Sequence, residues 1–121
     1  MQVWGKDSPR MKELLKSLTN KGKVIVYPKL YINTITDVVI AKQVSYIIQH
    51  NLKGIFHLVA DDVISYKDLY NELITGLGFN NASMEENFEE EGYFVILSKR
   101  NNEFPRQLAL TNKSVITYLI N

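Results

Sequence analysis

The stretch Gly54–Leu77, GIFHLVADDVISYKDLYNELITGL, decides the fold of this 121-residue chain. Its first seven residues, 54–60, are apolar on both sides of an extended strand, which is typical of a parallel sheet covered by helices on each face. A short polar bend follows, and Ser65 with Asp68 predicts a capping-box helix start. Large side chains then recur at helical spacing, and Gly78 predicts the helix end. The stretch therefore predicts a strand–turn–helix unit.

Upstream of this unit, the chain alternates between strand and helix signals. Residues 1–4 have the pattern of a strand end, and Ser8 with Pro9 marks the cap and first turn of a helix. The run KVIVY at 23–27 predicts a short strand that stops at Pro28, because proline removes a donor from the strand ladder.

A second helix is predicted after residues 29–34, KLYINT, which we interpret as a polar-aromatic loop. Thr34 and Asp37 fit a capping pair at its start, with the carboxylate also favoured by the helix dipole. Apolar residues at helical spacing then predict a wide buried face. These residues are Ile40, Ala41, Val44, Ile47 and Ile48.

Downstream of the unit, the pattern is weaker. Residues 80–91 are polar and acidic, 93–98 (YFVILS) have the composition of a strand, and 99–106 have that of a loop. A short extended piece is predicted at 107–110, and Thr111 caps a last helix. Alternating strands and helices over 121 residues predict one α/β domain covering residues 1–121.

Composition excludes several classes of protein. The chain has no cysteine, so disulfides, a thiol nucleophile and a cysteine zinc site are excluded, and a reducing cytoplasm is the expected location. No apolar run approaches the roughly 18 residues that span a bilayer, and the N-terminus lacks a signal-peptide pattern. A net charge of +1 argues against general nucleic-acid affinity, so neither a nucleic acid nor a membrane is an expected partner.

The charge is unevenly distributed along the chain. Residues 1–53 hold nine Lys or Arg against three Asp or Glu, a net charge of +6, whereas residues 54–121 hold five against ten, a net charge of −5. The split is consistent with two unrelated solvated surfaces, with an anionic ligand near the basic half, or with head-to-tail packing of copies. Together with two-faced apolar elements, it predicts a homo-oligomer.

Four ordered stretches resemble a known family. They are WGKDSPR (4–10), YINTITDVVIAKQVSYII (31–48), GIFHLVADDVISYKDLYNEL (54–73) and FPRQLALTNKSV (104–115). The set resembles the C-terminal portion of an extended short-chain dehydrogenase/reductase and is most similar to the branch of dTDP-4-dehydrorhamnose reductases and sugar-nucleotide epimerases. The resemblance implies a Rossmann-like α/β fold whose dinucleotide-binding half is missing from this chain.

The missing motifs limit the chemistry that the resemblance implies. The family's G-x-x-G-x-x-G turn is absent, and none of the seven tyrosines has a lysine four positions later, as the family's catalytic pair requires. We therefore expect no catalytic residue and no cofactor site in this chain, with NAD or NADP held by the N-terminal cofactor domain of a full-length parent. The parent would be a reductase or epimerase acting on a nucleotide-sugar.

Two departures from the family pattern bear on the substrate. Where rhamnose-pathway reductases show D-Q-x-G-x-P-T, only Thr34 is retained, and where they show R-P this chain has Phe104-Pro105. The resemblance then implies a nucleotide-sugar or a related ligand. The substrate-side loop supplies the candidate ligand residues Lys29, Tyr31, Asn33 and Thr34, and the candidate phosphate partners are Arg10, Lys12 and Arg106.

Other polar residues have simpler interpretations. We interpret His57 as a core histidine of the buried strand, His50 as a helix-end residue, and Asp61-Asp62 as turn residues. The glutamates between 85 and 91 lack the spacing of a calcium loop and indicate a solvated face. A non-catalytic binding or regulatory module on the same scaffold is the alternative function, and a fragment without a function of its own is a third.

Overall fold

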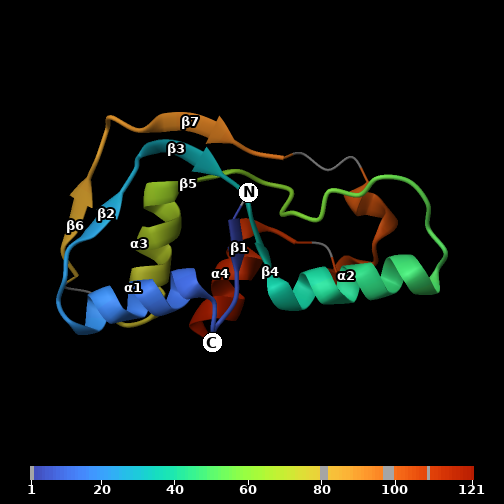
Figure 1. Ribbon diagram of the computed structural model, residues 1–121, viewed down its shortest axis with the longest axis horizontal. Helices are drawn as coiled ribbons and strands as arrows, with labels where there is room; N and C mark the ends of the chain where they lie inside the picture. Colours follow the sequence, from blue (N-terminus) through green and yellow to red (C-terminus); the bar gives the residue numbers. More distant parts are fainter. Residues whose placement is uncertain (1, 80–81, 97–99, 109) are drawn as a thin grey trace.

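A computed structural model describes residues 2–79, 82–96, 100–108 and 110–121. Four α-helices alternate with short strands, and two 3₁₀ turns precede the last helix (Figure 1). The helices are α1 (Pro9–Thr19), α2 (Asp37–Gln49), α3 (Tyr66–Gly76) and α4 (Asn112–Ile120). The strands are β1 (Gln2–Trp4), β2 (Val24–Val26), β3 (Lys29–Ile32), β4 (Thr34–Thr36), β5 (Ile64–Ser65), β6 (Met84–Glu86) and β7 (Glu91–Phe94). The 3₁₀ turns are η1 (Asn101–Glu103) and η2 (Arg106–Leu108).

The strands form three small sheets that are mainly parallel. β1 pairs with β4 and β2 with β6, both in parallel. In the third sheet β3 lies between β5, which is antiparallel to it, and β7, which is parallel. The predicted α/β class is therefore confirmed.

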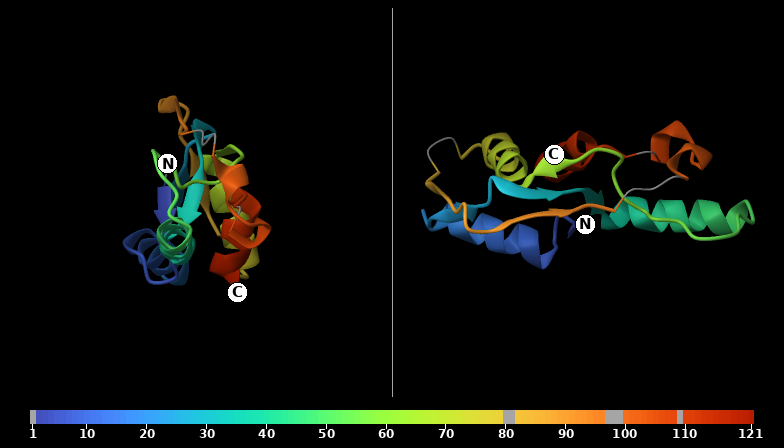
Figure 2. Two further views of the ribbon diagram at one scale, coloured as in Figure 1. Left: turned by 90° about the vertical axis from the view of Figure 1, so that its right-hand side faces the viewer. Right: turned by 90° about the horizontal axis from the view of Figure 1, so that it is seen from above.

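The helices lie in two layers on opposite sides of the strands. Figure 2 shows α1 and α2 on one side of the strand layer and α3 and α4 on the other. The main helix-to-strand contacts agree with this view, because α3 contacts β2 and β3, α4 contacts β4, and α1 contacts β2. The apolar core lies between these layers and includes Trp4, Ile35 and Leu69.

Helix starts follow the local capping signals closely. The Ser8 and Ser65 side chains accept hydrogen bonds from Met11 N and Asp68 N, at 3.3 and 3.1 Å. Thr111 and Ser114 form a reciprocal capping box at the start of α4. Three predicted caps are thus confirmed.

The start of α2 and the segment before it differ from the prediction. Residues 29–36 form two strands, β3 and β4, rather than a loop, because their backbones pair with β7, β5 and β1. β4 continues through Thr36, so the helix is capped by the Thr36 side chain, which accepts from Val39 N at 3.3 Å. The predicted cap Thr34 lies inside β4 instead.

The predicted strand at 54–60 is not a strand in the described structure. Residues 54–60 pass along the molecule without a ladder partner among the described residues, and only Val59 and Ala60 are buried. Ile55 is 79% exposed and His57 is also exposed, so the interpretation of His57 as a core histidine is wrong.

The predicted buried face of α2 is only partly present. Ile40 is half-buried against the core and Ile47 is half-buried, whereas Ala41, Val44 and Ile48 are exposed, Ile48 at 73%. The only fully buried residue of α2 is Gln43, whose Nε2 donates to Leu108 O at 2.7 Å.

The downstream boundaries were predicted less well than the helix caps. β7 begins and ends earlier than the predicted strand at 93–98, whose residues 97–98 lie outside the described part, and β6 was not predicted. Residues 106–108 form a 3₁₀ turn rather than the start of an extended piece, and Ala109 is not described.

Candidate functional site

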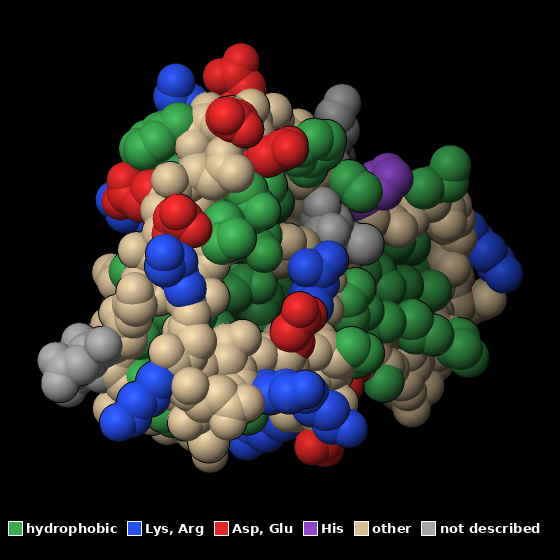
Figure 3. All heavy atoms as spheres, turned by 60° about the vertical axis from the view of Figure 1, so that its left-hand side comes forward, with side chains coloured by type: hydrophobic (Ala, Val, Ile, Leu, Met, Phe, Trp, Pro, Cys, Tyr) green, Lys and Arg blue, Asp and Glu red, His purple; other side chains and the backbone are tan. Residues whose placement is uncertain are grey.

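A cavity of about 290 Å³ lies between α1, β2 and α3. We call it the tyrosine pocket, because three tyrosines, one just after β2 and two on α3, form its aromatic wall. Its lining residues are Arg10, Glu13, Leu14, Ser17, Lys23, Val24, Ile25, Tyr27, Tyr66 and Tyr70. Figure 3 shows hydrophobic side chains in a hollow of this face, with charged side chains around it.

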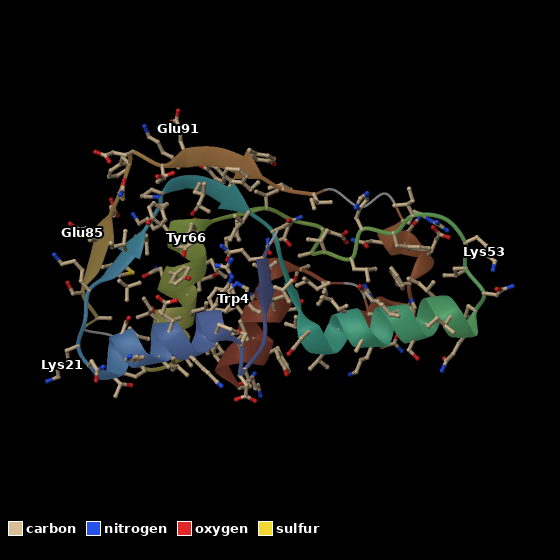
Figure 4. All side chains as sticks on the ribbon, in the orientation of Figure 1. Trp4, Lys21, Lys53, Tyr66, Glu85 and Glu91 are labelled. Atoms are coloured by element: carbon tan, nitrogen blue, oxygen red, sulfur yellow. The ribbon has the colours of Figure 1, made fainter. Side chains whose placement is uncertain are left out.

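The tyrosines are held by contacts with one another and with the core. Tyr66 and Tyr70, one turn apart on α3, stack with ring centroids 4.5 Å apart, and Tyr66 donates a hydrogen bond to the Tyr70 hydroxyl at 3.0 Å. Tyr27 meets Tyr66 edge-on at 5.2 Å, and buried Trp4 meets Tyr70 edge-on at 5.8 Å. In Figure 4 Tyr66 and Trp4 lie in the middle of the molecule. The aromatic wall is therefore a rigid surface that suits a planar ligand.

The charged residues of the pocket come from α1 and from the residue before β2. Arg10 and Lys23 supply two cations, and Glu13 supplies one carboxylate one turn after Arg10. A guanidinium binds a phosphate through two parallel hydrogen bonds, and an ammonium adds a point charge. A carboxylate accepts from hydroxyl and ring N–H groups. The lining thus combines anion recognition with aromatic and hydroxyl recognition.

The pocket is better equipped for binding than for proton transfer. Burial, followed by the hydrogen bond with Tyr66, raises the pKa of Tyr70 far above its ordinary value, so its hydroxyl stays protonated. The lining contains no histidine. The described side chains there can hold and orient a ligand.

The structure places the predicted site residues at several separate locations. Arg10 lines the tyrosine pocket, whereas Lys12 is exposed outside its lining. Lys29 and Tyr31 are exposed on β3, where Tyr31 faces Tyr93 of β7 with ring centroids 6.1 Å apart. Arg106 is exposed on η2, which packs against α2. The structure therefore brings Arg10, but not the other candidate cations, into the pocket.

Asn33 and Thr34 are fully buried and make internal contacts. Asn33 Nδ2 donates to Ile96 O at 2.7 Å and to Ala60 O at 3.3 Å. Thr34 N and Oγ1 both donate to Asn112 Oδ1, at 2.9 and 2.6 Å. These contacts join β4 to α4 and to the segment after residue 59. A structural role thus accounts for the Thr34 side chain, whereas the buried Asn33 Oδ1 has no hydrogen-bond partner among the described residues.

Sequence reasoning names Arg10 as a candidate phosphate partner, and Arg10 lines this pocket, but it does not name the tyrosines as pocket residues. Tyr66 and Tyr70 are among the large side chains that recur at helical spacing after Ser65, a pattern that indicates only a packed helix face. Their spacing of four residues stacks two rings on one helix face, and this was the available signal. The role of Tyr27 depends on where β2 crosses α1 and α3, which no local pattern specifies.

The helix start that follows Gly5 does not fit the pyrophosphate of a dinucleotide. Gly5 is the glycine just before a helix start, and it packs against the Asp37 carboxylate, where an added side chain would collide. A pyrophosphate placed there would face a negative charge rather than a cradle of N–H donors. Over the described ranges, no three His, Asp or Glu side chains converge as a metal site would require. No described helix is long and apolar enough to cross a membrane.

Comparisons with known proteins support the fold assignment. By sequence the chain matches no protein-family profile and no curated protein. By structure it is similar to a dTDP-4-dehydrorhamnose reductase from Clostridium acetobutylicum, with a TM-score of 0.79 and 14% identity over 97% of this chain and 45% of the reductase. The fold is that of the C-terminal part of an extended short-chain dehydrogenase/reductase.

Two further solved structures share this fold. The enzyme WbmH from Bordetella bronchiseptica, in complex with NAD⁺, matches with a TM-score of 0.66 and 15% identity over 97% of this chain and 42% of WbmH. A UDP-N-acetylglucosamine 4-epimerase from Bacillus cereus matches with a TM-score of 0.68 and 12% identity over 99% of this chain and 46% of the epimerase. The chain therefore spans a little under half the length of each of these proteins.

Proposed function

We propose that this chain is the nucleotide-sugar-binding portion of an NAD(P)-dependent reductase or epimerase and is inactive alone. The observation that carries the proposal is the tyrosine pocket, in which Arg10 and Lys23 lie beside a stacked tyrosine pair. A nucleotide-sugar presents a planar base, a diphosphate and sugar hydroxyls, and the lining offers a partner for each. The three similar folds support this class, because two of them are named as enzymes of nucleotide-sugars.

The proposed ligand orientation follows from where the charges lie. The base stacks against the rings of Tyr66 and Tyr27, and the diphosphate lies between Arg10 at the start of α1 and Lys23 before β2. The Glu13 carboxylate accepts from a base N–H or a sugar hydroxyl. The hydride donor and the proton-transfer groups come from a cofactor-binding domain, since the pocket itself holds neither.

Isothermal titration calorimetry with dTDP-glucose and with UDP-N-acetylglucosamine tests the proposal. We expect saturable heat with at least one of them and none with NADH or NADPH alone. Trp4, the single tryptophan, touches Tyr70, so its fluorescence should change in the same titration.

A matched pair of variants localises the binding. Arg10→Ala should weaken it about tenfold or more, because a charge-assisted hydrogen bond is lost. Lys12→Ala removes a cation from the same turn of α1, outside the pocket, and should change the affinity less than threefold. Absence of saturable binding by either nucleotide-sugar, or equal losses in both variants, would refute the assignment.

The alternative of a non-catalytic binding module is favoured by the same lining, which holds ligand partners without a proton-transfer group. The two functions differ in a reconstituted enzyme. Addition of a cofactor-binding domain produces turnover only if the chain is part of a reductase or epimerase.

A further inference from the structure

The outer side of β6 is an unpaired strand edge. β6 pairs with β2 on one side, and no strand of the described structure pairs with its other side. Figure 1 shows β6 outside β2 at the rim of the molecule, and Figure 4 shows Glu85 at this rim. An unpaired edge presents a row of backbone donors and acceptors to which a further extended chain can bind.

The hydrogen bonds between β6 and β2 indicate which backbone groups face outward. Ser83 O accepts from β2 at 2.9 Å, and Asn87 N donates to β2 at 2.8 Å. Alternate residues of a strand direct their backbone groups towards the same neighbour, and the residues between them direct theirs towards the other side. The N–H and C=O groups of Met84 and Glu86 therefore point away from β2, towards the unpaired edge.

A shallow pocket of about 280 Å³ lies beside this edge, and we call it the edge pocket. It is lined by Ile25 of β2 and by residues 85–89. Ile25 and Phe88 are 45% and 53% exposed and form its apolar part. Asn87 Oδ1 accepts from Glu89 N at 2.9 Å, which orders the turn that presents Phe88. The edge pocket thus offers apolar contact area directly beside the free backbone groups.

The charged residues of the edge pocket are all acidic. Its lining contains Glu85, Glu86 and Glu89 and no lysine or arginine. Lys67 of α3 pairs with Glu86, with Nζ 2.5 Å from Oε1, whereas no cation of the described residues pairs with Glu85 or Glu89. A lysine or arginine side chain has an apolar stem and a cationic end, so it complements exposed apolar groups beside two carboxylates.

A second copy of this chain does not complement the same edge. Pairing of two β6 edges would bring the glutamates of both copies together, and like charges on paired strands are unfavourable. The basic residues of α1 lie on a helix, whose backbone groups are already bonded within the helix. A segment that is both basic and extended meets both requirements.

We propose that the outer edge of β6 binds a basic, extended peptide segment of another protein, which adds a strand to β6 and places a lysine or arginine side chain in the edge pocket. The backbone groups of Met84 and Glu86 supply the strand contacts, and the carboxylates of Glu85 and Glu89 select the charge. The inference does not depend on the proposed function, because its residues other than Ile25 lie outside the tyrosine pocket.

A labelled peptide tests the proposal. The probe is fluorescein-labelled Thr-Lys-Val-Lys-Val-Lys-Thr-amide, titrated with the full chain in fluorescence polarisation at low salt. One control peptide has glutamate in place of each lysine, and another is N-methylated at each lysine and valine, which removes the backbone donors but keeps the charge. We expect saturable binding of the probe and affinities about tenfold or more weaker for both controls.

Two outcomes of this titration would overturn the proposal. If the glutamates only protect the edge from pairing, the probe will not bind saturably. If the N-methylated peptide binds as tightly as the probe, the contact is one of charge alone and β6 does not accept a strand.

Matched variants place the binding at the edge pocket. Glu85→Gln and Glu89→Gln should each weaken binding of the probe about threefold, because each removes one ion pair with the peptide. Glu72→Gln removes the same charge from an exposed position of α3 outside the pocket and should change the affinity less than about 1.5-fold. Equal losses in the three variants would contradict a site at β6.

Hydrogen exchange tests the mode of contact residue by residue. The amides of Met84 and Glu86 should become protected about tenfold or more when the probe is bound. The amide of Asn87 already donates to β2 and should change little. Binding without protection of Met84 and Glu86 would contradict strand addition.

Discussion

The two ends of the molecule differ in how they bury their apolar residues. Around α3 and α4 nearly every large side chain is covered by another element of the same chain, including Leu69, Leu73, Val115 and Leu119. Around α2 and residues 54–58, by contrast, Val44, Ile48 and Ile55 face outward. Both ends have apolar residues at regular spacing, so the difference lies in which partners the described chain provides. A pattern predicts that a face will be covered, but not by which molecule.

The difference between the two ends should be largest in the effect of one substitution, Ile→Ala, made at each end. Ile74 on α3 is 4% exposed and Ile48 on α2 is 73% exposed. Ile74→Ala should lower the free energy of unfolding by about 2–5 kcal/mol, because it removes buried methyl groups and leaves a cavity. Ile48→Ala should stay within about 0.5 kcal/mol. Urea unfolding of both variants measures this, and similar losses in the two would mean that α2 is covered in the isolated chain.

Two buried amides provide a second contrast between the ends. Asn112 Oδ1 accepts from Thr34 N and Oγ1, and its Nδ2 donates to Asp62 O at 2.8 Å. Gln43 is 1% exposed, and its Oε1 has no partner within the described structure. The first amide is fully used, whereas the second is only half satisfied.

Asn112→Leu should therefore destabilise the chain by about 2–4 kcal/mol, because two buried donors of Thr34 lose their acceptor. Gln43→Met keeps the volume and removes the unpartnered oxygen, so its cost should be below about 1 kcal/mol. Chemical unfolding of the two variants measures both losses of unfolding free energy. A greater loss of unfolding free energy in Gln43→Met than in Asn112→Leu would contradict this expectation and show that the half-satisfied Gln43 amide stabilises the chain more than the Asn112 amide does.

The helix caps were predictable from sequence because their causes lie within four residues. Ser8, Ser65 and Thr111 each bind an amide in the turn that they start, so spacing alone identifies them. The sequence predicts Thr34 as the cap of α2, but the cap is Thr36, and both residues have a suitable hydroxyl. Pairing of β4 with β1, a long-range contact, decides between them.

The strands and the site depended on contacts that the local sequence does not encode. β3 (KLYI) and β6 (MEE) lack an alternation of apolar and polar residues, and pairing with neighbouring strands defines them. Residues 54–60 have the pattern of an inner strand, yet the chain contains no described strand to pair with them. Arg10 was proposed as a ligand partner from its residue type, whereas the pocket that it lines exists only where α1, β2 and α3 meet.

The pocket end should also show a specific response to alkaline pH. Burial raises the pKa of Tyr70 above the value of about 10 expected in the unfolded chain. Its stabilising contribution is complete below about pH 10 and is lost as the pH rises towards the folded pKa, by up to about 1.4 kcal/mol per pH unit. Urea midpoints between pH 9 and 11 should therefore fall less steeply in Tyr70→Phe than in the parent chain. Tyr93→Phe, at a ring that is 65% exposed on β7, should leave the slope unchanged.

The smallest expected effect is the weak self-association of the isolated chain. The exposed apolar side chains Val44, Ile48 and Ile55 predict that copies contact one another at high micromolar concentration, and the +6 and −5 halves predict a contribution from charge. Figure 4 places Glu85, Glu91 and Lys21 at one side of the molecule and Lys53 beyond the end of α2. Light scattering should show association that 0.5 M NaCl reduces by a few-fold and that Ile48→Lys reduces further. Ile48→Lys adds a charge to the apolar contact, whereas salt screens only the distant charges. A monomer at low salt and high micromolar concentration would contradict both contributions. If salt reduces the association but Ile48→Lys does not, the contact between copies lies away from Ile48.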